Sequence, residues 1–98
     1  MEVMADHEAV LRDLASRYVW WTSPERALER RSHFLCQLLQ LGTADDVRSA
    51  RRILGDEPLR DALRSAPPGV MDARSWSYWH LVLFRRPAPP LPRRPLPS

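Results

Sequence analysis

The residues whose chemistry stands out first are His33 and Cys36, because imidazole and thiolate groups are common ligands of zinc. They lie three positions apart, a spacing that places both on one face of a helix. Two ligands do not complete a structural zinc site, which usually takes four. We therefore expect no metal site, with Cys36 buried as a small apolar group and His33 at or near the helix surface.

Asp45 and Asp46 are adjacent carboxylates, a pairing that can serve acid and base catalysis. They follow Thr43, a common helix-capping residue, and acidic side chains stabilise the positive first turn of a helix. The chain has only three glycines, all isolated, which excludes a glycine-rich phosphate-binding loop. The sequence therefore predicts two helix-stabilising aspartates in a protein that is not an enzyme and needs no cofactor.

The aromatic residues form two groups that can bind a partner protein. Trp20 and Trp21 are adjacent, and Trp76 and Trp79 flank a tyrosine later in the chain. Because adjacent side chains point in different directions, we expect one tryptophan of each pair in the core and another at the surface. Exposed tryptophan beside arginine is typical of binding hot spots. The expected contacts on the folded body are Trp20, Trp21, Arg74, Tyr78 and Trp79.

The arginines favour a second hypothesis, a small DNA-binding repressor. Segments 44–54 and 57–66, joined at Gly55, resemble a helix-turn-helix, whose second helix would enter the major groove of operator DNA. Their basic residues are Arg48, Arg51, Arg52, Arg60 and Arg64. Both segments also carry acidic residues, and Asp61 lies on the recognition face, where it repels phosphate. A solvated, ion-paired surface is therefore the alternative interpretation.

The C-terminal segment 85–98 differs from the rest of the chain. It holds six of the ten prolines and four arginines without an acidic residue, a formal charge of +4, whereas residues 1–84 carry −1. Proline-rich segments favour an extended polyproline II conformation. We expect a stiff arm whose Arg86, Arg93 and Arg94 pair with acidic groups of a partner. Residues 89–94 also match the proline-rich ligands of SH3-type grooves, and an inert tail is the alternative.

Prolines and glycines divide the body into segments with helical spacing of apolar residues. The expected helices cover residues 6–18, 24–41, 44–54, 57–66 and 73–84. No alternating strand pattern with hairpin turns is present. The sequence thus predicts an all-α fold: a single small bundle of four to five short helices over residues 1–84, followed by a disordered or extended Pro/Arg-rich tail over residues 85–98.

The expected core and location follow from the same patterns. The residues expected to be buried are Val10, Leu14, Leu28, Leu35, Leu38, Val47, Leu54, Leu59, Leu63, Trp76 and Leu83. The longest apolar runs, at 18–21 and 81–84, have four residues, and a membrane span needs about 20. A single cysteine cannot form an internal disulfide, and the N-terminal residues lack the apolar stretch of a secretory signal. We expect a cytoplasmic protein that does not span a membrane.

Several short motifs resemble those of small bacterial proteins encoded beside AbiEii-type nucleotidyltransferase toxins. Within residues 18–84 these motifs are Tyr18-Val19-Trp20-Trp21 with Ser23-Pro24-Glu25, Leu41-Gly42-Thr43 with Asp45-Asp46-Val47, Pro68-Gly69, and Arg74-Ser75-Trp76-Ser77-Tyr78-Trp79-His80. The resemblance implies an antitoxin-like protein that binds and neutralises a cognate nucleotidyltransferase toxin without catalysis of its own. Antitoxins often bind DNA as well, so the two hypotheses are compatible. The oligomeric state stays open.

Overall fold

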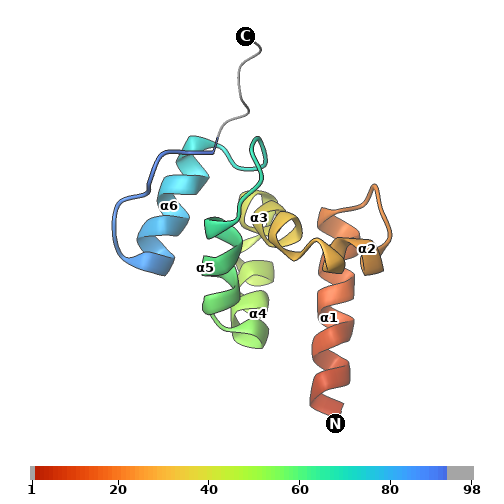
Figure 1. Cartoon of the computed structure of the whole chain (residues 1–98). Coiled ribbons are helices and arrows are strands. Elements are labelled where there is room, and N and C mark those ends of the chain that lie inside the picture. The colour runs from red at the N-terminus through yellow and green to blue at the C-terminus, as the bar shows by residue number, and fades with distance from the viewer. Residues whose placement is uncertain (1, 93–98) are drawn as a thin grey trace.

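The computed structural model describes residues 2–92, and their side chains from residue 7 onward (Figure 1). The described part contains no strand and six helices: α1 (Glu2–Tyr18), α2 (Pro24–Glu29), α3 (Arg31–Leu41), α4 (Ala44–Leu54), α5 (Glu57–Arg64) and α6 (Ala73–Phe84). The predicted all-α class is confirmed, with one or two helices more than expected. Arg93 and Arg94 lie outside the described residues.

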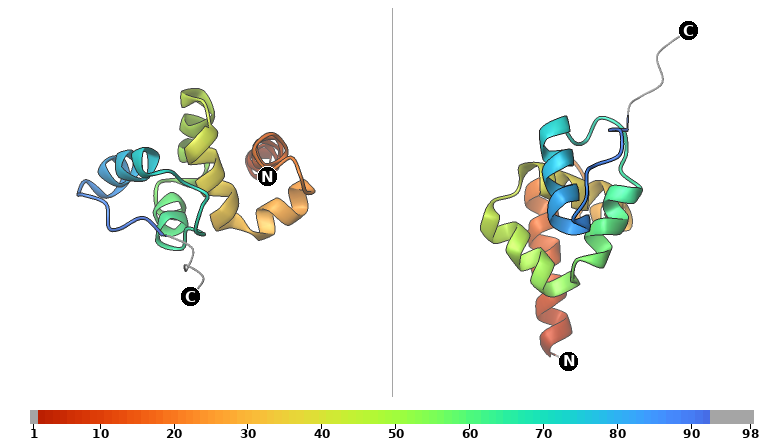
Figure 2. Two further views of the ribbon diagram at one scale, coloured as in Figure 1. Left: turned by 90° about the horizontal axis from the view of Figure 1, so that it is seen from above. Right: turned by 90° about the vertical axis from the view of Figure 1, so that its left-hand side faces the viewer.

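Helix α3 lies at the centre of the fold, and each of the other five helices packs against it. Figures 1 and 2 show α1 and α2 on one side of α3 and α6 on the other. A helix surrounded in this way must be apolar around most of its circumference. Its buried residues are Phe34, Leu35, Cys36, Leu38 and Leu39. The surfaces beside α1 and beside α6 are therefore separated by the central helix.

The expected continuous helix over residues 24–41 is wrong, because the chain turns at Arg30. This residue has φ −101° and ψ 59°, outside the helical region, and it ends α2 and begins α3. The turn lets α2 bury Ala27 while α3 crosses the molecule to bury Phe34 and the residues that follow it. One straight helix cannot do both. No proline or glycine marks the break, so no residue type at this position predicts it.

Three of the helices begin with side-chain caps, among them Thr43, which the sequence predicts. Ser23, Thr43 and Asp72 each accept a hydrogen bond from a backbone N–H three residues later, at 3.3, 3.1 and 2.8 Å. Asp56, at the start of α5, makes no such bond and instead accepts two hydrogen bonds from Arg51 at 2.8 and 3.0 Å. Helix α5 ends two residues earlier than expected. Helices α4 and α6 have the predicted bounds.

Most of the expected core residues are buried in one cluster. Those confirmed are Leu14, Leu35, Leu38, Val47, Leu59, Leu63, Trp76 and Leu83. Leu28 and Leu54 are half-buried and pack against the cluster. Val10 is 37% exposed, so its predicted burial is wrong, and its neighbour Leu11 is buried instead. The N-terminal part of α1 extends beyond the other helices (Figure 1), which leaves only one narrow stripe of α1 in contact with the body.

The segment that follows α6 turns back along the body. Arg85 has a left-handed conformation with φ 58°, which ends the helix and reverses the chain. The indole N–H of Trp76 then donates to the carbonyl oxygen of Pro89 at 2.7 Å. Ala88 and Leu91 are half-buried against the core. The first part of the proline-rich segment is thus extended and lies on the folded body. Across the described residues, no helix is long and apolar enough to cross a membrane.

Candidate functional site

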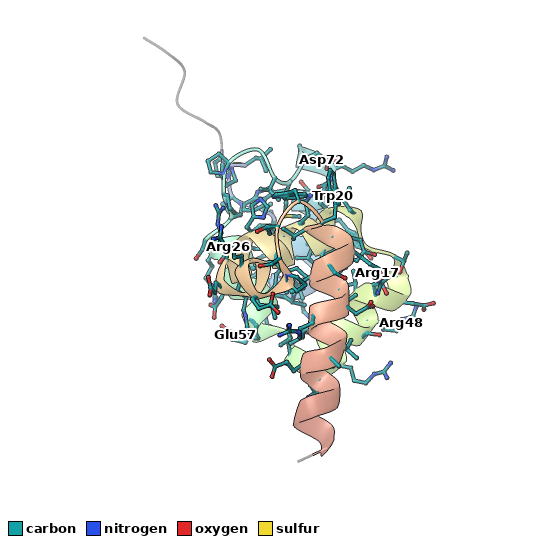
Figure 3. The ribbon with its side chains drawn as sticks, turned by 90° about the vertical axis from the view of Figure 1, so that its right-hand side faces the viewer. Arg17, Trp20, Arg26, Arg48, Glu57 and Asp72 are labelled. Carbon is teal, nitrogen blue, oxygen red and sulfur yellow. The ribbon has the colours of Figure 1, made fainter. Side chains whose placement is uncertain are left out.

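The turn between α1 and α2 exposes two adjacent tryptophans. We call residues 19–22 the Trp20–Trp21 turn. Trp20 is 75% exposed and Trp21 is 51% exposed, whereas Val19 is buried at 3%. Val19 anchors the turn to the core, and Trp20 lies at the end of α1 (Figure 3). The two indole rings meet edge to face, with centroids 5.6 Å apart and planes at 87°. The turn therefore presents a contiguous aromatic surface to solvent.

A hydrogen-bond network fixes the end of α1 that carries this turn. The hydroxyl of Tyr18 donates to the carboxylate of Asp46 on α4 and accepts from the backbone N–H of Thr43 at 3.3 Å. The guanidinium of Arg17 also binds Asp46, with bonds of 2.8 and 3.2 Å. These contacts tie the start of α4 to the last turn of α1, so the Trp20–Trp21 turn is positioned by a rigid neighbour.

The same network shifts the titration of its two acidic groups. The hydrogen bond from Tyr18, followed by that from Arg17, holds the pKa of the Asp46 carboxyl below its ordinary value. Burial, followed by the hydrogen bond to Asp46, raises the pKa of the Tyr18 hydroxyl. Both shifts favour a neutral phenol beside an ionised carboxylate. Asp46 thus stabilises the start of α4 and has its oxygens engaged within the protein. Asp45 is exposed and pairs with Arg48 at 3.4 Å.

A pocket opens behind Trp21, between the turn, α2 and the start of α3. We call it the Trp21 pocket, and its volume is about 290 Å³. The indole of Trp21 forms one wall and meets the imidazole of His33 edge to face, with centroids 5.8 Å apart. The residues lining the pocket are Val19, Trp21, Thr22, Arg26, Ala27, Arg30 and His33. The pocket therefore combines apolar walls with two guanidinium groups.

The charged side chains that line the Trp21 pocket are all positive. No acidic residue lines it, and neither Arg26 nor Arg30 forms an ion pair with any described side chain. Burial, followed by the charge of Arg30, lowers the pKa of His33 below its ordinary value. His33 is thus held neutral at physiological pH and adds a hydrogen-bonding group rather than a third charge. The pocket suits an anionic group small enough to enter it.

Helix α6 presents a second aromatic surface on the other side of α3. Tyr78 is 52% exposed and stacks on Trp79, with centroids 4.9 Å apart and planes at 20°. Trp79 is half-buried, and its indole N–H donates to the carbonyl oxygen of Leu39 at 2.8 Å. Both residues line a groove of about 390 Å³ between α4 and α6. Trp79 therefore holds α6 against α3, while Tyr78 and the exposed Arg74 face solvent.

A third hollow, of about 510 Å³, lies between α5, α6 and the returning segment 86–92. Trp76, His80 and Phe84 form its floor, with His80 stacked on Phe84 at 5.2 Å between centroids. The guanidinium of Arg86 lies 5.9 Å from the Phe84 ring. Arg86 is one of the three tail arginines expected to pair with acidic groups of a partner. Its guanidinium thus lies over the aromatic floor of this hollow, next to the returning segment.

The structure does not bring the sequence-predicted contact residues into one patch. Trp20 and Trp21 lie together on the α1 side of the molecule. The other described members, Arg74, Tyr78, Trp79 and Arg86, lie on or after α6, and α6 packs against α3 and α5 rather than against α1 or α2 (Figure 2). The two groups form separate surfaces. The surface of Trp20 and Trp21 is the more exposed of the two, and it adjoins the Trp21 pocket.

The candidate metal pair does not converge. Cys36 is fully buried, and its thiol donates to the carbonyl oxygen of Ala62 at 3.3 Å. Burial raises the pKa of this thiol to about 12, so it stays protonated. His33 instead packs against Trp21. Within the part of the chain that the structure describes, no three ligating side chains cluster as a metal site would require.

Most arginines of the helix-turn-helix hypothesis form ion pairs or hydrogen bonds with other groups of this chain. Arg51 pairs with Asp56, and both Arg60 and Arg64 pair with Glu57. Arg64 also pairs with Asp61, and Arg60 donates to the carbonyl oxygen of Leu83 at 2.7 Å. Phosphate would have to displace these partners. This arrangement matches the ion-paired surface that was the alternative interpretation.

Arg26 and Arg30 are the residues of the candidate site that the sequence analysis missed. Together with His33 they follow a spacing of four and three residues, which is one face of a helix. This stripe begins five residues after Trp21, close enough for a turn to bring them together. A search for basic residues at helical spacing near the tryptophan pair would have found them.

Comparison with known proteins does not add a relative. No protein-family model matches the chain, and neither a curated protein nor a solved structure matches it. The fold and the site therefore stand on the chain's own residues.

Proposed function

We propose that the protein is a non-catalytic protein-binding module whose Trp20–Trp21 turn anchors a partner protein. The observation that carries this proposal is the exposure of two adjacent indoles, 75% and 51%, on a turn tied to the core by Val19. Tryptophan is among the residues most enriched at interface hot spots, where truncation costs about 2 kcal/mol or more. An exposed pair of this kind is costly in water unless a partner covers it.

The way in which the turn is held supports the same function. Tyr18 and Arg17 bind Asp46, so the end of α1 is fixed before a partner arrives. A preorganised contact loses less conformational entropy on binding than a flexible loop does. Arginines 26 and 30 beside the indoles supply groups that can form charge-assisted hydrogen bonds. The surface therefore combines a rigid aromatic anchor with polar groups at its edge.

The partner that we propose is a nucleotidyltransferase toxin, which the protein would neutralise as an antitoxin does. This identity follows from the resemblance of the motifs, since the first of them, residues 18–21, contains both tryptophans of the turn. The role requires binding rather than chemistry from this chain. It also gives the exposed indoles a permanent partner, because antitoxin and toxin would be produced together.

Co-expression with the product of the adjacent gene tests this proposal. The wild-type chain should copurify with a nucleotidyltransferase and suppress its toxicity, and the W20A/W21A double variant should lose both properties while keeping its helical circular dichroism. Leu81→Ala is the matched control, because Leu81 is 56% exposed on α6, on the other side of α3. Normal binding and neutralisation by a folded W20A/W21A variant would reject the Trp20–Trp21 turn as the anchor.

A further inference from the structure

We propose that the Trp21 pocket receives an acidic side chain from the bound partner. In this arrangement Arg26 and Arg30 bind the carboxylate, and the indole of Trp21 covers the apolar part of the same segment. The inference deepens the proposed function, on which it rests, by naming the chemistry of the partner segment. It makes Arg26 and Arg30 the residues that select the partner, with Trp20 and Trp21 as the anchor.

Arg26 and Arg30 are two of the seven described arginines that form no ion pair, and both line the Trp21 pocket. Six arginines, at positions 12, 17, 48, 51, 60 and 64, form ion pairs within the described part of the chain. Arg26 and Arg30 form none there, although acidic residues are close in the sequence. Glu25 pairs with Arg12, and Glu29 lines a neighbouring hollow with Arg30 rather than this pocket. Two guanidinium groups thus share one pocket without a counter-charge.

The walls of the pocket strengthen the attraction for a single anion. Val19, Trp21 and Ala27 form an apolar wall on one side of the exposed Arg26 and Arg30, and an apolar neighbour strengthens a charge-assisted hydrogen bond by lowering the local dielectric. The hydroxyl of Thr22 and the neutral imidazole of His33 add hydrogen-bonding groups at the rim. A volume of about 290 Å³ admits one carboxylate-bearing side chain and excludes a folded element.

The charge of the whole body favours a protein carboxylate over a nucleic acid. Residues 1–84 carry a formal charge of −1, so the body as a whole does not attract a polyanion. Nucleic-acid binding depends on many phosphate contacts along a basic surface. Here Arg26 and Arg30 share one small pocket beside the indole of Trp21, whereas other described arginines without an ion pair, such as Arg52 on α4 and Arg74 on α6, lie outside it. An acidic segment with apolar neighbours matches both features.

A peptide titration followed by nuclear magnetic resonance tests the inference without the partner protein. The probe is the acetylated and amidated peptide Leu-Asp-Glu-Leu, and its control is Leu-Asn-Gln-Leu. The acidic peptide should shift the indole N–H signal of Trp21 and the Nε–H signals of Arg26 and Arg30 in a saturable manner, with a Kd of about 1 mM. The neutral peptide should bind at least about tenfold more weakly.

Matched variants separate the pocket from general electrostatic attraction. The R26Q/R30Q variant should weaken binding of the acidic peptide at least about tenfold, while R52Q/R85Q, which removes two exposed arginines elsewhere, should leave it unchanged. Equal binding of both peptides, no saturable shift, or equal losses in the two double variants would overturn the inference. Tighter binding of a 12-nucleotide single-stranded DNA at the same signals would overturn it in favour of a nucleic-acid site.

The outcome does not depend on the test of the proposed function. If the acidic peptide binds as expected and W20A/W21A still binds the toxin normally, the anchor fails and the anion pocket stands. If W20A/W21A abolishes toxin binding and R26Q/R30Q affects neither the toxin nor the peptide, the anchor stands and the inference fails.

Discussion

Replacing Tyr18 with phenylalanine removes one hydroxyl from the network that positions the Trp20–Trp21 turn. The ring keeps its half-buried place at the end of α1, so the substitution leaves the apolar packing intact. The lost contacts are the hydrogen bond to the Asp46 carboxylate and the one accepted from the N–H of Thr43. The change therefore isolates the tie between α1 and α4.

The expected cost follows from the charge of the acceptor. A hydrogen bond to an ionised group contributes about 1.5–3 kcal/mol. Asp46 keeps its two bonds to Arg17, and the site is partly open to solvent, so the cost should lie at or just below the lower end of this range. We expect the free energy of unfolding to fall by about 1–1.5 kcal/mol. For a domain of this size, that corresponds to a melting temperature lower by about 5–10 °C.

The pH dependence gives the prediction a second, independent part. The pKa of Asp46 is lowered in the folded protein, so the stability it contributes is present above its unfolded pKa and is lost as the pH falls through the folded pKa. The pKa of Tyr18 is raised, so its contribution is present below its unfolded pKa and is lost as the pH rises through the folded value. The difference between wild type and Y18F should be largest between about pH 5 and pH 9 and shrink on both sides.

Urea denaturation followed by circular dichroism at pH 3, 7 and 11 measures both parts. Asp46→Asn is the companion variant, because it removes the charge while keeping a similar shape. A cost for Y18F below about 0.3 kcal/mol at pH 7, or a cost that does not change with pH, would show that the hydroxyl does not hold α1 to α4. In that case the turn would not be positioned as we argue.

Three further changes test other parts of the structure. Cys36 should resist alkylation by iodoacetamide at pH 8 in the folded protein and react in urea, because burial raises its pKa to about 12; rapid labelling of the native state would contradict this. Gly55→Ala should lower the free energy of unfolding by about 1–3 kcal/mol, because residue 55 has φ +79° and ψ 177°, a region nearly confined to glycine. An unchanged urea midpoint would be inconsistent with that geometry. Deletion of residues 87–98 should lower the free energy of unfolding by about 1–2 kcal/mol and red-shift the tryptophan fluorescence, because Trp76 loses its hydrogen bond to Pro89. Identical stability would show that the returning segment adds nothing to the stability of the body.

The helices with clear chemical signals at both ends were the predictable part of the fold. Thr43 and Gly55 bound α4, and Asp72 begins α6, because a capping side chain and a positive-φ glycine each have few alternatives. The division of residues 24–41 was not predictable. Arginine is a good helix former, so Arg30 carries no local signal for a turn. The chain turns there because α2 and α3 pack against different neighbouring helices. Tertiary packing overrode local preference.

The candidate site was predictable in its residue types and not in its grouping. The expectation that one tryptophan of each pair lies in the core is wrong for Trp20 and Trp21, which are both exposed, because the neighbouring Val19 is the residue of this turn that enters the core. The sequence does not show that α3 separates these residues from Tyr78 and Trp79. The Trp21 pocket was missed because the spacing of Arg26 and Arg30 does not show that the turn at residues 19–22 places Trp21 beside them. The spacing of Arg26, Arg30 and His33 can suggest a basic helix face, but only the fold shows that Trp21 lies against it.

The most direct test of the central claim is the dissociation constant of the complex between this chain and the nucleotidyltransferase that we propose as its partner, measured by titration calorimetry for wild type and W20A/W21A. Loss of one hot spot of about 2 kcal/mol weakens binding about 30-fold, so the double variant should bind at least that much more weakly. Leu81→Ala should bind within about twofold of wild type. A folded W20A/W21A variant with the wild-type dissociation constant would contradict the claim that the Trp20–Trp21 turn anchors the partner.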